Sequence, residues 1–150
     1  MSAIEVQLKI RPRSIAGVAA GFIAWWVAFY SSMGVFAYFW PEILDAGQVA
    51  ISDNDWSLIS TPMLILFTVM YFWINPIAGW LTVAITKNRR DAIITTIPLV
   101  LFAAFQHWYT LWNLLPNWYN LVVVILIPPL IFFGGRIAKI EEQTSVSRSE

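Results

Sequence analysis

The sequence predicts an all-α integral membrane protein: an antiparallel bundle of four transmembrane helices with both termini in the cytoplasm. Three observations lead to this prediction: the composition, the length of the apolar stretches and the placement of the charges. Of 150 residues, 59% are hydrophobic and 12% are charged, whereas soluble domains carry about a quarter charged residues. Four apolar stretches are each long enough to cross a hydrocarbon core of about 30 Å as a helix.

The first span is expected over 14–40, after a polar cytoplasmic arm of residues 1–13. Lys9, Arg11 and Arg13 in that arm resemble the start of a signal peptide. The apolar run is longer, however, than a signal-peptide core of about 7 to 15 residues, and no A-x-A pattern closes it. We therefore interpret 14–40 as a span that stays in the membrane.

The remaining spans follow in short succession. We expect the second over 60–86, the third over 91–116 and the fourth over 118–137. The turn between the third and fourth spans is so short that these two helices must be neighbours. The transmembrane domain thus covers 14–140, and a polar, serine-rich cytoplasmic tail covers 141–150.

The stretch 41–57 is the only sizeable connection and is expected to form an outer loop. Its charged residues are all acidic: Glu42, Asp45, Asp53 and Asp55. The run 52–55 is typical of a turn or a helix cap. A weak cation site is the alternative, but the run lacks the length and ligand pattern of a calcium loop. We favour a solvated acidic loop.

The basic residues predict the topology. Every lysine and arginine lies in the N-terminal arm, in the turn from Lys87 to Arg90, or at the C-terminal end. The positive-inside rule therefore places both termini and this turn in the cytoplasm, and an even number of spans requires the same arrangement. Trp40, Trp56 and Trp112 would then lie near the outer interface, where aromatic rings are enriched. We expect a multi-pass protein of the plasma membrane.

A stripe of small residues runs along the first span. Gly17 and Gly21 form a GxxxG pair, and Ala20 and Ala24 extend the stripe. Such stripes let the backbone of a second helix approach closely. The stripe indicates either packing within the chain, which is the commoner use of GxxxG, or dimerisation and docking to another subunit.

Prolines interrupt the second and fourth spans. Asn75 and Pro76 lie near the middle of 60–86, and Pro128 and Pro129 lie near the centre of 118–137. Proline removes a backbone donor and leaves an upstream carbonyl without its helical partner. We expect these four residues to mark kinks, and they are candidates for lining a cavity.

Residues for enzymatic chemistry are missing from the sequence pattern. No Asp, Glu, Lys or Arg lies deep in a span, so the proton relays that such residues build are not indicated. The chain has no cysteine, and HExxH, GxSxG and P-loop motifs are absent. A formal net charge of zero gives no sign of a nucleic-acid partner. We predict a protein without a catalytic or metal site of its own.

His107 is the only histidine and lies in the third span. Counted back from Pro116, it would sit about 13 Å below the outer end of its helix. The commoner role for such a residue is a hydrogen bond to a neighbouring helix, with Gln106, Thr110 or Asn113 close in sequence. The functional alternative is cofactor binding, as a single ligand to a haem or chlorophyll or as a contact to a quinone.

Three tryptophans lie near the middle of their spans: Trp25, Trp26 and Trp73. A mid-membrane indole needs a partner for its N–H or a large flat surface to pack on. Aromatic packing between helices is the simpler interpretation, and a bound lipid, quinone or pigment is the alternative.

Three functional hypotheses follow. The leading one is a structural or accessory subunit that packs against other subunits of a larger membrane complex, or against itself through the GxxxG face. The first alternative is a small oligomeric transporter or channel for a neutral solute, with Asn75 beside its path. The second alternative is a redox or photosynthetic subunit that binds haem, chlorophyll or quinone through His107.

Overall fold

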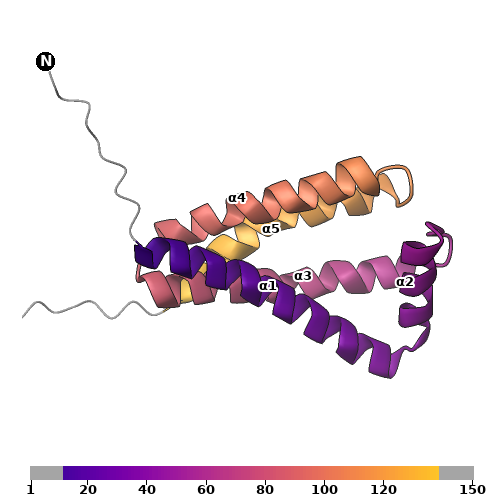
Figure 1. The fold of residues 1–150 in the computed structure, drawn as a ribbon, viewed down its shortest axis with the longest axis horizontal. Helices are drawn as coiled ribbons and strands as arrows, with labels where there is room; N and C mark the ends of the chain where they lie inside the picture. Colours follow the sequence, from indigo (N-terminus) through magenta and orange to yellow (C-terminus); the bar gives the residue numbers. More distant parts are fainter. Residues whose placement is uncertain (1–11, 139–150) are drawn as a thin grey trace, which may run out of the picture.

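The computed structural model describes residues 12–138, and this part of the chain is all-helical (Figure 1). The helices are α1 (Pro12–Phe39), α2 (Glu42–Ser52), α3 (Thr61–Thr86), α4 (Arg90–Ala104), the π-helix η1 (Phe105–Thr110) and α5 (Asn117–Ile137). The predicted tail, and the predicted arm apart from Pro12 and Arg13, lie outside the described residues.

Four helical segments are long and apolar enough to cross a membrane: α1, α3, α4 together with η1, and α5. The predicted four apolar helices of membrane-spanning length are therefore confirmed. Large apolar side chains are exposed on the outside of all four, as at Val27, Phe72, Leu101 and Ile125. Such surfaces suit contact with lipid rather than water.

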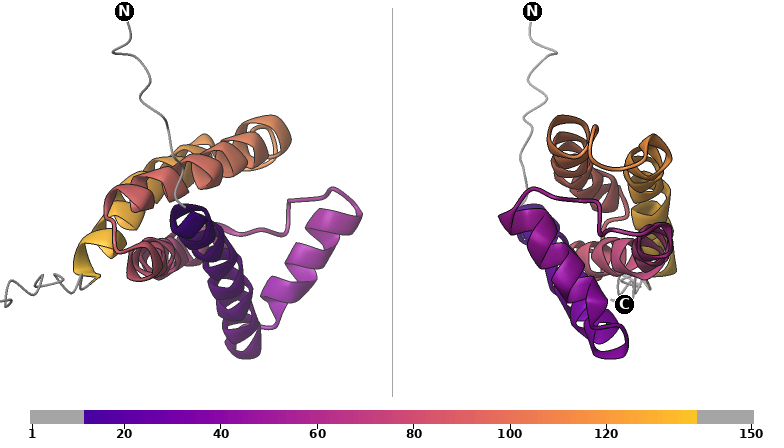
Figure 2. Two further views of the ribbon diagram at one scale, coloured as in Figure 1. Left: turned by 60° about the vertical axis from the view of Figure 1, so that its left-hand side comes forward. Right: turned by 90° about the vertical axis from the view of Figure 1, so that its right-hand side faces the viewer.

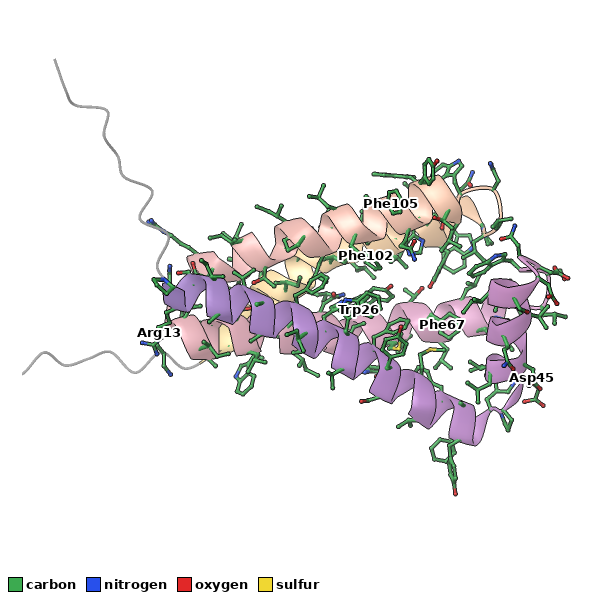
Figure 3. The ribbon with its side chains drawn as sticks, viewed as in Figure 1. Arg13, Trp26, Asp45, Phe67, Phe102 and Phe105 are labelled. Carbon is green, nitrogen blue, oxygen red and sulfur yellow. The ribbon has the colours of Figure 1, made fainter. Side chains whose placement is uncertain are left out.

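The helices converge at one end of the molecule and spread apart at the other (Figures 1 and 2). At the narrow end, Nε of Arg13 donates a 2.6 Å hydrogen bond to the carbonyl of Ile85, which joins the start of α1 to the end of α3. At the wide end, α2 turns back steeply from the end of α1 (Figure 2, left). Arg13 and Asp45 mark the narrow and wide ends in Figure 3.

The small-residue stripe of α1 packs inside the chain. A Cβ atom added to Gly17 would clash with the side chain of Thr86, and one added to Gly21 would clash with that of Thr82. The two glycines therefore let α1 lie directly on α3, and this face of α1 is covered. Ala20 and Ala24 are half-buried beside them.

The contact between α3 and α5 depends on glycine in the same way. A Cβ atom on Gly79 would meet the carbonyl oxygen of Ile131, and one on Gly134 would meet the carbonyl oxygen of Pro76. Backbone thus rests on backbone at both crossing points. Both helices continue past their prolines, which lie inside α3 and α5.

The structure differs from the sequence prediction at the outer connection. Most of the expected loop 41–57 forms the helix α2. Ile43, Ala46 and Ala50 share one buried face at helical spacing, and the acidic residues of the first turn suit the positive end of the helix dipole. The helix ends before Asn54, whose φ of 53° is left-handed, a conformation that asparagine tolerates.

The third span is also shorter than the predicted helix 91–116. Its α-helical part ends at Ala104, the π-helix η1 follows, and 111–116 form a turn. At the end of η1, the N–H of Leu111 donates a 3.0 Å hydrogen bond to the carbonyl of Gln106, five residues earlier, as in a π-helix. His107 therefore lies only three residues before the end of η1, or about 5 Å at helical rise, so it is shallower than the sequence indicated.

Candidate functional site

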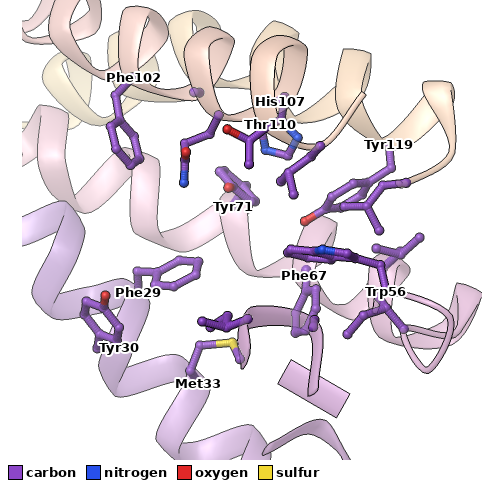
Figure 4. Close-up of a pocket in the computed structure, with 18 of the residues that line it drawn as sticks. Phe29, Tyr30, Met33, Trp56, Phe67, Tyr71, Phe102, His107, Thr110 and Tyr119 are labelled. Carbon is purple, nitrogen blue, oxygen red and sulfur yellow. The ribbon is translucent and has the colours of Figure 1, made fainter. Parts of the chain in front are cut away.

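A cavity of about 490 Å³ lies in the wide half of the molecule (Figure 4). All helices contribute to it: the second half of α1, the end of α2, the first half of α3, the end of α4, η1 and the start of α5. The volume falls within the range of about 300 to 1,000 Å³ that is typical of small-molecule sites.

Aromatic rings form one side of the cavity. Trp25 stacks on Phe29 with ring centroids 5.5 Å apart, and it lies 6.1 Å from the ring of Tyr71. Trp26 meets Phe102 edge-on at 5.1 Å, which joins α1 to α4 below the cavity. These flat surfaces suit a ligand with an apolar or aromatic body.

His107 is held in one orientation by α5. Its Nδ1 lies 2.8 Å from Oδ1 of Asn120, and both residues are buried. The amide nitrogen of Asn120 donates to the carbonyls of Leu111 and Leu115 at 3.4 and 3.2 Å. The carbonyl of Leu111 also accepts from the backbone N–H groups of Leu114 and Leu115, so Asn120 adds to the hydrogen bonds of the turn after η1. The orientation of Asn120 is set by its own two bonds.

This network fixes the tautomer of the imidazole. The Asn120 oxygen can only accept a hydrogen bond, so Nδ1 of His107 carries the hydrogen. In the neutral ring Nε2 is then an acceptor. Within residues 12–138 Nε2 has no hydrogen-bond partner, and it is not among the fully enclosed atoms. Because His107 lines the cavity, Nε2 is its free polar atom there.

Two tyrosines add hydroxyl groups to the same space. Tyr71 and Tyr119 line the cavity and are 5% and 6% exposed. Neither hydroxyl makes a hydrogen bond to another described residue, and neither is fully enclosed. The rings of His107 and Tyr119 are 5.5 Å apart, and Figure 4 shows the Tyr119 hydroxyl pointing into the cavity. Three buried side chains that carry polar atoms without a partner among the described residues thus line one largely apolar cavity.

The segment after α2 covers the cavity at the wide end. Nε1 of Trp56 faces Oδ1 of Asn54 at 3.4 Å, and both residues line the cavity. The N–H of Ser57 donates to Asp55 at 3.0 Å, and hydrogen bonds from Ser57 hold the pKa of Asp55 below its ordinary value. Residues 52–55 are all exposed, as expected for a solvated acidic run, and Asn54 is the member of this run that also lines the cavity.

The lining residues of the cavity differ in exposure. Its innermost side chains, such as Trp25, Leu64 and His107, are buried. Its exposed lining residues are Tyr30 on α1, Thr110 on η1, and Ile51 and Asn54 at the end of α2. Tyr30 lies nine residues before the end of α1, or about 13 Å at helical rise, so an exposed lining residue occurs well down the side of the bundle.

The predicted kink residues do not line this cavity. Asn75 is fully buried, where its Oδ1 accepts a 2.9 Å hydrogen bond from Nε1 of Trp25 and its amide donates to the carbonyl of Tyr71. Pro128 and Pro129 are exposed on the outside of α5. The cavity is built instead around His107, which the sequence did single out.

Sequence reasoning missed Asn120, Tyr71 and the lining role of Tyr119. The hydrogen-bond partner of His107 lies on α5 and not among its neighbours in sequence. A signal was available: the short turn makes the third and fourth spans neighbours, and Asn120 is a polar residue in the first turn of an apolar helix.

Among the described residues, no group of three or more His, Asp and Glu side chains is placed to hold a metal ion. Comparisons with protein-family models, with curated proteins and with solved structures find no match for this chain.

Proposed function

We propose that this chain is a non-catalytic membrane protein that binds a neutral, lipid-soluble molecule in the cavity beside His107. One observation carries the proposal: Nε2 of His107 and the hydroxyls of Tyr71 and Tyr119 are unpaired and border the same apolar cavity. Leaving a buried polar group unsatisfied costs about 1 to 3 kcal/mol. A ligand with an apolar body and a polar head would satisfy these groups and contact the aromatic wall.

The proposal includes the orientation in the plasma membrane. The narrow end carries the basic residues of the helix ends and turns: Arg13, Lys87, Arg90 and Arg136. The acidic residues of α2 lie at the wide end. The positive-inside rule then makes the narrow end cytoplasmic, with an antiparallel bundle and both termini on that side. The cavity would lie in the outer half of the membrane.

This orientation gives the ligand a route from the bilayer. Tyr30 and Thr110 line the cavity, are exposed and lie on two different long apolar segments, and we propose that the entrance lies between them. A lipid-soluble molecule would reach it by lateral diffusion, without crossing the water phase. Neutral ligands are favoured because, among residues 12–138, no charged side chain lines the cavity to offset the cost of a buried charge.

The geometry gives less support to a solute transporter or to an accessory subunit that docks through its GxxxG face. A solute path beside Asn75 is disfavoured by its complete burial and its hydrogen bonds. Docking of an accessory subunit through Gly17 and Gly21 would need the face that α3 covers. A place in a larger complex stays a prediction, and it is compatible with ligand binding.

The test is to extract the protein from its native membrane in mild detergent and analyse the purified peak. Organic extraction and mass spectrometry should identify one stoichiometric lipid-soluble molecule beside structural lipids. The same peak shows whether other subunits accompany the chain. A visible absorbance band that disappears in His107→Ala would assign a haem or chlorophyll.

A matched pair of variants makes the test specific for the cavity. Ala103 lines the cavity and is 5% exposed, whereas Leu101 faces outward and is 66% exposed. Ala103→Phe would fill the cavity and should remove the bound molecule, and Leu101→Phe should retain it. If both variants retain the same molecule, or if the parent protein carries none, the proposed function is wrong.

A further inference from the structure

We infer that the ligand of this cavity presents a hydroxyl hydrogen to Nε2 of His107, so that the site selects phenols or hydroquinones over quinones and ethers. This inference rests on the proposed function, since it names the class of molecule that the same cavity takes. It follows from three features: the fixed tautomer, the neighbouring hydroxyls and the aromatic wall.

The tautomer decides which hydrogen-bonding group the ligand must bring. Nδ1 of His107 donates to Oδ1 of Asn120, whose orientation is set by its two bonds to the carbonyls of Leu111 and Leu115. Nε2 therefore offers a lone pair. A quinone carbonyl or an ether oxygen would place a second lone pair against it, whereas a hydroxyl would donate a hydrogen bond.

The hydroxyl of Tyr119 suits the other side of the same ligand oxygen. Its ring lies 5.5 Å from the imidazole of His107, edge to face. A tyrosine hydroxyl both donates and accepts, so it can donate to the oxygen whose hydrogen points at Nε2. One phenolic oxygen would thus satisfy both side chains.

The same hydroxyls argue for an oxygen-bearing ligand over a metal-bearing macrocycle at Nε2. The flat face of a tetrapyrrole is apolar around the metal, and it would leave the hydroxyls of Tyr71 and Tyr119 unpaired. A compact ring would instead pack on the wall formed by Trp25 and Phe29 and bring its oxygen to the polar side of the cavity.

The experiment compares two probes that differ in a single hydrogen-bond donor, 2-naphthol and 2-methoxynaphthalene. The full chain is held in a neutral detergent, and binding is followed by quenching of tryptophan fluorescence, since Trp25, Trp26 and Trp56 line the cavity. We expect the naphthol to bind about tenfold more tightly, because the ether leaves a buried acceptor unpaired. Under anaerobic conditions, tetramethylhydroquinone should likewise bind more tightly than tetramethylbenzoquinone.

Variants distinguish the contribution of the acceptor Nε2 of His107 from the contributions of the neighbouring side chains. His107→Phe should bring the naphthol-to-ether ratio close to one. Tyr119→Phe removes a donor that serves both probes, so it should weaken both and keep the ratio. Asn120 is a positioning residue: Asn120→Leu should lower the ratio, because the imidazole hydrogen can then move to Nε2.

The measurement on the unaltered chain decides the inference even if a variant does not fold. A naphthol that binds more tightly than its ether, with the ratio lost in His107→Phe, supports it. Equal binding of both probes overturns the inference and leaves the cavity a general lipophilic site. Binding of neither probe, together with a purified protein that carries no small molecule, overturns the inference and the proposed function together.

Discussion

Nε1 of Trp25 on α1 donates a 2.9 Å hydrogen bond to Oδ1 of Asn75 on α3, and both side chains are buried. This bond gives the N–H of a mid-span indole the hydrogen-bond partner that it needs when it is buried. It also explains why Asn75 is tolerated in an apolar helix, since its amide donates in turn to the carbonyl of Tyr71 at 3.1 Å. The pair joins the floor of the cavity to the core of the bundle.

The first prediction concerns this pair. Trp25→Phe and Asn75→Leu should each destabilise the fold. A double-mutant cycle should give a coupling energy above the average of about 0.6 kcal/mol for hydrogen bonds between membrane helices and up to about 1.7 kcal/mol. Unfolding in mixed micelles with increasing SDS measures it. The more exposed pair of Trp73 and Ser32, also 2.9 Å apart, should give a smaller value. Equal coupling in both pairs would contradict a role for burial.

The second prediction concerns the contact between α3 and α5. Gly134→Ala should cost about 1 to 3 kcal/mol, because the added methyl group would force the two backbones apart. Gly34 has nothing within 4 Å of the position of an added Cβ. Gly34→Ala should therefore be neutral or slightly stabilising, as alanine favours the helix by about 0.5 to 1 kcal/mol. The same SDS titration compares them, and similar effects at both positions would refute the close backbone contact.

The third prediction concerns the docking of α2. Ile43 is 1% exposed and Leu44 on the same helix is 56% exposed. Ile43→Ala should loosen α2 from α1 and α3 and raise the hydrogen-exchange rate of the α2 amides by about tenfold or more, since a buried Ile→Ala change costs about 2 to 5 kcal/mol. Leu44→Ala should leave these rates unchanged. Rapid exchange of α2 in the unaltered protein would argue against a docked helix.

The fourth prediction concerns the topology. The chain contains no cysteine, so single cysteines report their own position. In intact cells a membrane-impermeant maleimide should label Asp53→Cys at the wide end, and it should label Lys87→Cys at the narrow end only after the membrane is opened. The reverse pattern would invert the orientation and place the cavity in the cytoplasmic half.

The candidate site could be predicted only in part. The sequence singled out His107 because a lone titratable residue in an apolar span has a functional or hydrogen-bonding role. It did not supply Asn120 as the partner, because a side chain 13 positions away meets the imidazole only when the π-helix and the following turn set the relative rotation of η1 and α5. The residues expected at kinks do not belong to the cavity: Asn75 is buried in a hydrogen bond with Trp25, and the two prolines of α5 are exposed.

By itself the sequence determined that the chain forms four apolar helices long enough to cross a membrane, because the length of an apolar run and the absence of charge are local properties. The tertiary structure decided what each helix face does. It showed that Gly17 and Gly21 serve α3 within the chain, that 42–52 fold as a docked helix, and that three polar atoms share one cavity. These outcomes depend on helix rotation and crossing, which no single stretch of sequence encodes.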